Sequence, residues 1–216
     1  MHKLLFPSLK GTWGYVNFGE ESLSLRKEKS NPLLMPTACG KWVQALHKKY
    51  SIDYSYGGYM EDRSNLWRGH YMLPGYTWHL GIDYTVPIGT PVVLPFDAVL
   101  VRSIVDTDQD GGWGGKTFFK LDNHIIIFAH MDRIATRLGQ CKAGDIIGFI
   151  ADELNNGGWF PHLHVQAVRS ADPLLDPLEV DGYDRLRTGI EHDFPRPDTL
   201  MDETWQNQQN LDAAAE

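Results

Sequence analysis

Residues 116–128 read KTFFKLDNHIIIF, and this stretch decides the fold class. Two apolar runs, Lys116 to Leu121 and His124 to Phe128, flank the dipeptide Asp122-Asn123. Turn residues between two such runs are typical of a tight β-hairpin. The sequence therefore predicts two adjacent antiparallel strands near the middle of the chain.

Short apolar runs separated by Gly, Pro, Asp and Asn continue from Tyr76 to Val168. Further strands are expected within 90–105, 145–150 and 163–168, with a break near Pro95. The spacing between these runs is too short for crossover helices, which excludes βαβ units. We therefore expect a mainly β fold with an antiparallel, barrel-like or sandwich core.

The flanks of this region have a different composition. Residues 1–70 mix Gly, Pro, Ser and charges, which predicts an irregular N-terminal extension packed on the core, with one amphipathic helix over 38–49. The core itself is expected over 71–180. Residues 181–216 are rich in Asp and Pro and then polar, which predicts an extended C-terminal wrap over the surface and a frayed tail.

Charge and hydropathy exclude several classes of function. The 216-residue chain has a formal net charge of −8 and no Lys/Arg cluster, so it is not expected to bind nucleic acid. No run approaches the roughly 20 apolar residues of a membrane span, and no signal peptide is visible. We therefore expect a cytoplasmic protein or one exported by a non-standard route. The oligomeric state and the redox state of Cys39 and Cys141 stay open.

Two short motifs carry candidate chemistry. His162 and His164 lie two residues apart, so in a strand both point to one face about 6.6 Å apart. They are two metal ligands, a ligand and a catalytic group, or two histidines on a solvated face. His79 and Asp83 would lie about 13 Å apart in an extended strand, so sharing one metal requires a bend, which Gly81 allows. Otherwise they are a surface histidine and a turn aspartate.

Taken together, the motifs favour a metal site. A catalytic zinc site has three protein ligands and an open fourth position for water. Such a site needs a nearby imidazole to take the proton of the water and to stabilise the oxyanion. His130, which ends the apolar run of 125–129, and His162 are the candidates for this role. The H-E-x-x-H pattern of other zinc peptidases is absent from the sequence.

Four blocks between Trp78 and Val168 resemble, in order, the motifs of the lysostaphin/LytM-type zinc metallopeptidases. The blocks are HLGID at 79–83 with PIGTPV at 87–92, FAHM at 128–131, LGQCKAGDIIG at 138–148, and PHLHV at 161–165. Each block is short, but four in the family's order are hard to obtain by chance. One departure is the loop before PHLHV, where Trp159 and Phe160 add bulk near the expected groove.

The resemblance implies a function and a role for each matched residue. It implies the lysostaphin-type peptidase fold and a zinc-dependent metalloendopeptidase that hydrolyses peptide bonds, with a peptide or peptidoglycan as substrate. The metal would be Zn²⁺. The implied metal ligands are His79, Asp83 and His164, and the implied catalytic residues are His130 and His162.

Two alternatives remain at this point. The first is an intracellular zinc peptidase or amidase that acts on a substrate outside the cell wall, which the lack of a visible export signal favours. The second is a non-catalytic regulatory module of the same fold. Such modules usually lose metal ligands, whereas all five matched positions are present here.

Overall fold

The computed structural model describes residues 1–26, 28, 30–68, 74–109, 111–170 and 179–215. The helices are α1 (His2–Leu5), α2 (Phe18–Glu21), α3 (Pro36–Tyr50), α4 (Ile190–Asp193) and α5 (Pro197–Ala215), with 3₁₀ turns at Ser22–Leu25 and Pro32–Leu34. The strands are β1 (Trp13–Tyr15), β2 (Tyr54–Gly57), β3 (Trp78–His79), β4 (Ile82–Thr85), β5 (Pro91–Val93), β6 (Ala98–Val105), β7 (Gly115–Leu121), β8 (His124–Asp132), β9 (Gly139–Cys141), β10 (Ile146–Ile150), β11 (Leu163–Arg169) and β12 (Tyr183–Asp184).

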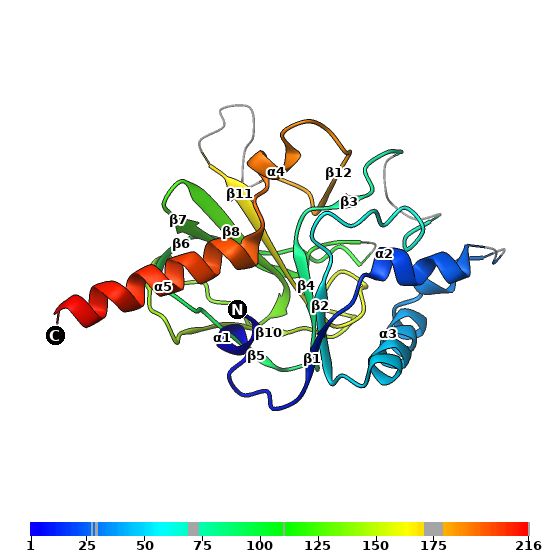
Figure 1. Cartoon of the computed structure of the whole chain (residues 1–216), viewed down its shortest axis with the longest axis horizontal. Coiled ribbons are helices and arrows are strands. Elements are labelled where there is room, and N and C mark those ends of the chain that lie inside the picture. The colour runs from blue at the N-terminus through cyan, green and yellow to red at the C-terminus, as the bar shows by residue number, and fades with distance from the viewer. Residues whose placement is uncertain (27, 29, 69–73, 110, 171–178, 216) are drawn as a thin grey trace.

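One large sheet dominates the molecule (Figure 1). Its strand order is β1-β2-β4-β11-β8-β7-β6-β9, and β10 joins β8 to β5 beside this path. The pairs are antiparallel except for β1 and β2, which run parallel. The prediction of a mainly β, antiparallel fold is therefore confirmed. The barrel-like description is too strong, because across the described residues the path starts at β1 and ends at β9 without closing.

The predicted hairpin forms the centre of this sheet. Strands β7 and β8 pair up to a turn in which Asp122 has a φ of 51°, a conformation that aspartate tolerates better than most residues. Strand β8 is paired on both sides, and both of its faces are covered. Ile126 and Phe128 pack into one apolar cluster, and Ile125 and Ile127 pack into another. Burial of both faces explains why β8 is apolar without alternation from Ile125 to Ala129.

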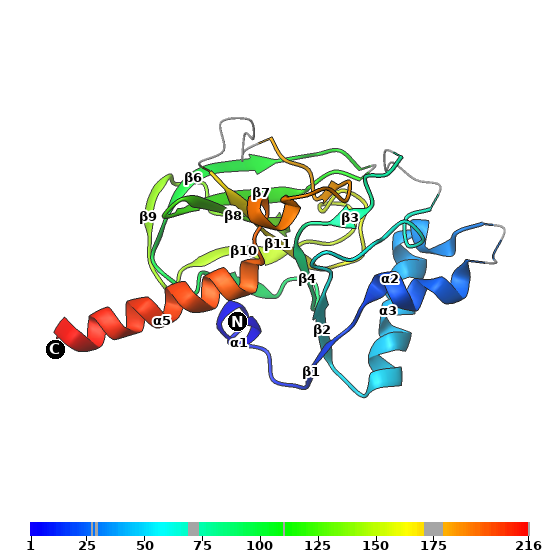
Figure 2. The ribbon, with the colours of Figure 1, turned by 45° about the horizontal axis from the view of Figure 1, so that its top comes forward.

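The N-terminal part is more regular than expected. The predicted helix is present as α3, and β1 and β2 extend the main sheet beside β4. Val43 and Leu46 of α3 are buried in a cluster that also contains Trp67, Trp159 and Phe160. This cluster therefore joins the N-terminal residues to the loop that precedes β11. Figure 2 shows α2 and α3 together on one side of the sheet.

The C-terminal part differs from the prediction of an extended wrap and a frayed tail. Pro197 begins α5, where its missing N–H has no helical partner to lose. Met201 of α5 is fully buried, and Asp202 lies 3.2 Å from the N-terminal amine. These contacts hold the first half of the helix against the core, and its far end extends beyond the core in both ribbon views.

The division into 1–70, 71–180 and 181–216 stays a prediction. Residues 69–73, at the first boundary, and 171–178, near the second, lie outside the described residues.

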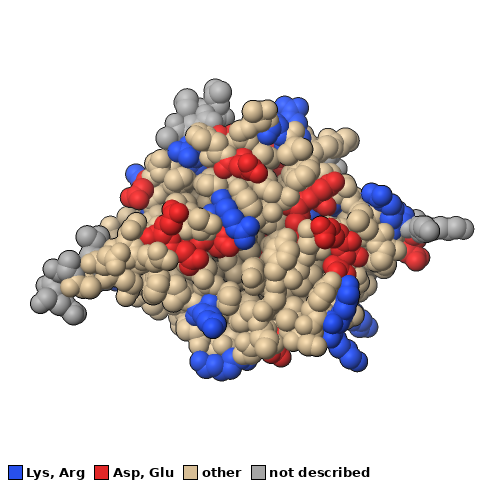
Figure 3. Space-filling view, in the orientation of Figure 1, with Lys and Arg blue, Asp and Glu red and all other residues tan. Residues whose placement is uncertain are grey.

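None of the described helices has the length and hydropathy needed to cross a bilayer. On the face in Figure 3, basic side chains lie among acidic ones. The prediction that the protein does not bind nucleic acid stays a prediction.

Candidate metal centre and active site

His79, Asp83 and His164 meet at one buried point. They come from β3, β4 and β11, and Asp83 and His164 are direct partners in the β4–β11 pairing. Nδ1 of His164 lies 3.0 Å from Nε2 of His79 and 3.0 Å from Oδ1 of Asp83. Nε2 of His79 lies 3.4 Å from the same carboxylate oxygen. The three predicted ligands are thus brought together, with all their ligand atoms within 4.8 Å of one another.

A bend at Gly81 makes this convergence possible. The sequence predicted such a bend, because His79 and Asp83 would lie too far apart in one extended strand. Strand β3 ends at His79 and β4 begins at Ile82, so the chain is not one extended strand between the two ligands. A Cβ atom on Gly81 would lie 2.5 Å from Cε1 of His164 and 2.6 Å from the carbonyl oxygen of Val165. Only glycine leaves room for the His164 ring at this position.

Hydrogen bonds on the outer side of each imidazole fix its tautomer. Nδ1 of His79 lies 3.0 Å from the carbonyl oxygen of Gly58, and a carbonyl only accepts, so Nδ1 is the protonated nitrogen. Nε2 of His164 donates to Oε1 of Gln166 at 3.0 Å. The Gln166 amide is itself oriented because its Nε2 donates to the carbonyl of Asp181. Both rings therefore turn an unprotonated nitrogen toward Asp83.

This donor set fits a zinc ion. Two imidazole nitrogens and one carboxylate oxygen converge, and zinc takes these ligand types with three protein ligands in catalytic sites. Tetrahedral bonds of about 2.0–2.1 Å place neighbouring ligand atoms about 3.3 Å apart. The observed separations of 3.0 to 3.4 Å bracket this value. The partners behind the rings are of the kind that orients metal-binding histidines.

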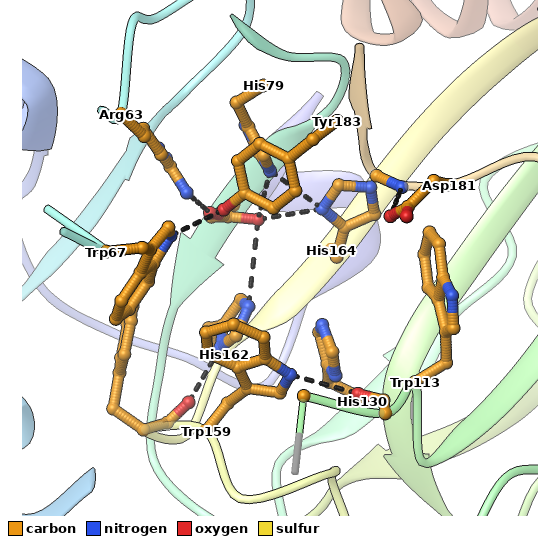
Figure 4. Close-up of a pocket in the computed structure, with 15 residues that line it drawn as sticks. Arg63, Trp67, His79, Trp113, His130, Trp159, His162, His164, Asp181 and Tyr183 are labelled. Carbon is orange, nitrogen blue, oxygen red and sulfur yellow. Dashed lines mark hydrogen bonds and ion pairs between the residues drawn. The ribbon is translucent and has the colours of Figure 1, made fainter. Parts of the chain in front are cut away.

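The two predicted catalytic histidines lie beside this group. The His130 and His162 rings have centroids 4.5 Å apart, and Nε2 of His162 lies 3.7 Å from Oδ1 of Asp83. Nδ1 of His130 donates to the carbonyl of Asn156 at 2.9 Å, and Nδ1 of His162 donates to that of Phe160 at 2.6 Å. Each ring therefore keeps an unprotonated Nε2. Figure 4 shows both rings in the pocket that also contains His79 and His164.

His130 occupies a strained backbone position. Its φ is 63°, and the β7–β8 pairing shifts register near this residue. A bulge of this kind re-aims a side chain relative to a regular strand. Positive φ at a non-glycine residue is costly and is found preferentially at functional sites. The apolar run before His130 predicted a strand end, whereas the residue lies within β8 at this irregularity.

Burial shapes the acid–base properties of the group. Burial lowers the pKa of His79 and His130 well below the ordinary histidine value, with Arg63 and His162 respectively adding to the effect. The pKa of His162 is also lowered, chiefly by burial. Burial alone would raise the pKa of Asp83, but His79 and Arg63 hold it well below its usual range. At neutral pH His79, His130 and His162 are therefore neutral, and the carboxylate of Asp83 is ionised.

Aromatic side chains form the walls of the pocket above these residues. Trp113 lies 5.4 Å from the ring of His164, and Tyr183 lies 5.2 Å from the ring of His79. Trp67 and Trp159 pack edge to face, with centroids 4.8 Å apart, and Phe160 stacks on His162. The sequence predicted that Trp159 and Phe160 add bulk near the groove, and both side chains line this pocket.

Several residues of the site lie outside the matched motifs. Arg63 donates to Oδ2 of Asp83 at 2.5 Å, and Trp67 donates to the hydroxyl of Tyr183 at 2.6 Å. Burial raises the pKa of Tyr183 to about 12, so the hydroxyl keeps its proton. Neither Arg63 nor Tyr183 carries a local sequence signal. The tyrosines nearest His79 in sequence are Tyr76, which does not line the pocket, and Tyr71, which lies outside the described residues.

Comparison with known proteins agrees with the geometry. A family model described as "Peptidase family M23" matches residues 77–177. This range includes all five predicted site residues. Residues 77–177 thus resemble peptidase family M23. The resemblance to lysostaphin/LytM-type peptidases is thereby confirmed.

Similar proteins include the DD-carboxypeptidase/endopeptidase Mpg of Neisseria meningitidis serogroup B and that of Neisseria gonorrhoeae. Each is 31% identical over 115 residues, which is 53% of this chain and 25% of the relative. The chain thus matches about a quarter of the length of these relatives.

Similar solved structures include the catalytic domain of the prophage-encoded M23 protein EnpA from Enterococcus faecalis. It is 24% identical with a TM-score of 0.40, over 55% of this chain and 80% of that one. The catalytic domain of lysostaphin from Staphylococcus simulans is 22% identical with a TM-score of 0.39, over 68% and 92%.

Proposed function

We propose that this M23 protein is a zinc-dependent metalloendopeptidase that hydrolyses peptide bonds in peptidoglycan peptides. The observation that carries the proposal is the convergence of His79, Asp83 and His164 on one point, with the unprotonated Nε2 atoms of His130 and His162 beside it. Family membership and the relatives named DD-carboxypeptidase/endopeptidase support the reaction class and the substrate class.

In this proposal Nε2 of His79, Oδ1 of Asp83 and Nδ1 of His164 hold the metal. A zinc ion bound there would polarise the scissile carbonyl and lower the pKa of a bound water to about 7. The outer hydrogen bonds to Gly58 and Gln166 keep the two ligand rings in the tautomers that this requires. Trp113, Trp159 and Tyr183 line the same pocket.

His130 and His162 then handle the protons. Their lowered pKa values keep both rings neutral, so an Nε2 atom is free to accept a proton from the attacking water. A ring that has accepted this proton becomes a donor at the same atom. It is then able to donate a hydrogen bond to the developing oxyanion or to deliver the proton to the leaving amine.

The test is digestion of purified bacterial sacculi with and without a zinc chelator, followed by mass spectrometry of the released fragments. We expect chelator-sensitive release, with fragment masses that identify the cleaved bond. His130→Ala and His162→Ala should each retain zinc and lose about 10²–10⁴-fold in rate. His124→Ala, at the half-buried start of the same strand as His130, is the matched control and should keep its activity.

Each alternative has its own outcome. If the zinc-bound protein releases nothing from sacculi but cleaves other peptides, the substrate lies outside the cell wall. If both histidine variants keep the biological role of the protein, the chain is a non-catalytic regulatory module. Activity that survives complete removal of the metal would contradict the proposal as a whole.

A further inference from the structure

Two buried ion pairs link Glu61 and Arg63, which precede the M23 match, to Asp83 of the proposed metal centre. Nη1 of Arg63 lies 2.5 Å from Oδ2 of Asp83, and Nε of Arg63 lies 3.3 Å from Oε2 of Glu61. All three side chains are only 2% exposed. Buried charges of this kind persist when they are paired and oriented by further hydrogen bonds.

The two oxygens of Asp83 have separate partners. Oδ2 accepts from Arg63, whereas Oδ1 faces the nitrogens of His164, His79 and His162 at 3.0, 3.4 and 3.7 Å. We propose that Arg63 is a positioning residue of the metal centre: it occupies one oxygen of Asp83 so that the other binds the metal alone. This inference rests on the proposed function, because it concerns how the same site holds its ion.

The arginine is itself held in place. Oε1 of Glu61 accepts from the backbone N–H of Gly58 at 2.8 Å, and Oε2 accepts from that of Gly19 at 3.4 Å. The backbone N–H of Arg63 donates to the carbonyl of Thr77. These bonds fix the guanidinium through the main chain.

The same short segment also orients a second ligand. The carbonyl of Gly58 accepts from Nδ1 of His79, and the backbone of Glu61 pairs with that of His79. Residues 58–63 therefore set the direction of two of the three ligands, His79 and Asp83. Residues that precede the family motifs therefore supply hydrogen bonds that orient the metal centre.

Gly58 shows how closely this segment approaches the ligands. Its φ is +108°, and a Cβ atom there would lie 2.5 Å from Nη2 of Arg63 and 2.7 Å from Nδ1 of His79. Any other residue would push apart the two groups that the segment brings together. Gly58→Ala is therefore a second, independent way to disturb the positions of Arg63 and His79.

Two physical effects of Arg63 oppose each other. Its positive charge repels a bound dication, so removing it would tighten metal binding if charge dominated. Its hydrogen bond orients the ligand, so removing it would leave Oδ2 without this donor and free the carboxylate to turn. Partners behind a metal ligand typically contribute about 10–100-fold to metal affinity. The geometry points to orientation as the larger effect.

The experiment measures Zn²⁺ affinity of the full chain by competition with a chromogenic chelator, together with the visible absorption of the Co²⁺-substituted protein. We expect Arg63→Met to bind Zn²⁺ about 10–100-fold more weakly and to change the Co²⁺ bands, because Asp83 would then offer two oxygens. Arg63→Lys should recover part of the affinity. Arg68→Met should match the parent protein, because Arg68 lies further along the chain and donates to the carbonyls of Leu25 and Glu28 instead of to Asp83.

Glu61→Gln and Gly58→Ala cover the case in which Arg63→Met does not fold. Each leaves Arg63 in the chain but disturbs its placement, so each should weaken Zn²⁺ binding and shift the Co²⁺ bands in a cooperatively unfolding protein. Unchanged affinity and unchanged bands in the folded variants, or tighter binding in Arg63→Met, would overturn the inference. A parent protein that binds no Zn²⁺ would instead overturn the proposed function.

Discussion

Acidification should destabilise the metal-free protein through three buried histidines of the proposed active site. His79, His130 and His162 are only 2%, 7% and 4% exposed, and burial lowers the pKa of each. An unfolded chain binds protons at these residues below about pH 6.5, whereas the folded chain binds them only at lower pH. The stability they contribute is thus fully present above this pH and is lost as the pH falls.

The size of the effect follows from proton linkage. A histidine that stays neutral in the fold but titrates normally when unfolded costs about 1.4 kcal/mol between pH 7.5 and 5.5. Three such residues give about 4 kcal/mol as an upper limit. Glu61 acts in the opposite direction, because burial raises its pKa and the folded state takes up a proton there. Asp83 adds nothing in this range, since its carboxyl is ionised in both states.

Denaturant unfolding in the presence of a chelator, at both pH values, measures this loss. His130→Asn should reduce the difference between the two pH values by about 1.4 kcal/mol, because it removes one of the three groups. Phe128→Leu is the matched control: it weakens the same strand without removing a titratable group, so the pH dependence should stay as in the parent. An equal stability of the parent at both pH values would refute the reasoning.

Further measurements test other parts of the structure. Zinc at about 100 times its dissociation constant should stabilise the protein by about 2.7 kcal/mol, and His164→Ala should abolish this gain in thermal unfolding. Gly81→Ala should weaken Zn²⁺ binding in a chelator competition, since the new Cβ would lie 2.5 Å from Cε1 of His164. A thiol reagent at neutral pH should modify Cys141 in the native protein and Cys39 only after unfolding, because Cys39 is buried and burial raises its pKa to about 12. Equal labelling of both by peptide mapping would contradict the buried placement of Cys39.

The sequence predicts the centre of the fold and of the site for identifiable physical reasons. Strand β8 is apolar from Ile125 to Ala129, and the turn at Asp122 marks where it begins, so local composition is sufficient. His164 lies in β11 and His162 immediately precedes that strand, and both rings face Oδ1 of Asp83, as the spacing of two suggested. Gly81 supplies the bend that a shared metal required. Each of these inferences depends on residues that are close in sequence.

What the sequence does not predict depends on contacts between distant segments. Helix α5 is missed because Pro197 indicates extended chain when its neighbours in space are unknown, although proline is well tolerated at a helix start. Whether a sheet closes is decided by its edge strands, and no local pattern records that β1 and β9 stay apart. Arg63 gives no signal because an arginine followed by polar residues is typical of a solvated surface.

The placement of Arg63 also bears on how the chain is divided. The family match starts at residue 77, yet Asp83 within the match accepts a hydrogen bond from Arg63, and Nδ1 of His79 donates to the carbonyl of Gly58. The pocket wall is shared in the same way, since Trp67 packs on Trp159. A buried charge left without its partner is costly, and the partner of Asp83 is Arg63. The residues that carry the motifs therefore need Arg63 to stabilise the buried carboxylate. The boundary of the family resemblance is therefore not the boundary of the site, and the residues before it belong to the catalytic unit that we propose.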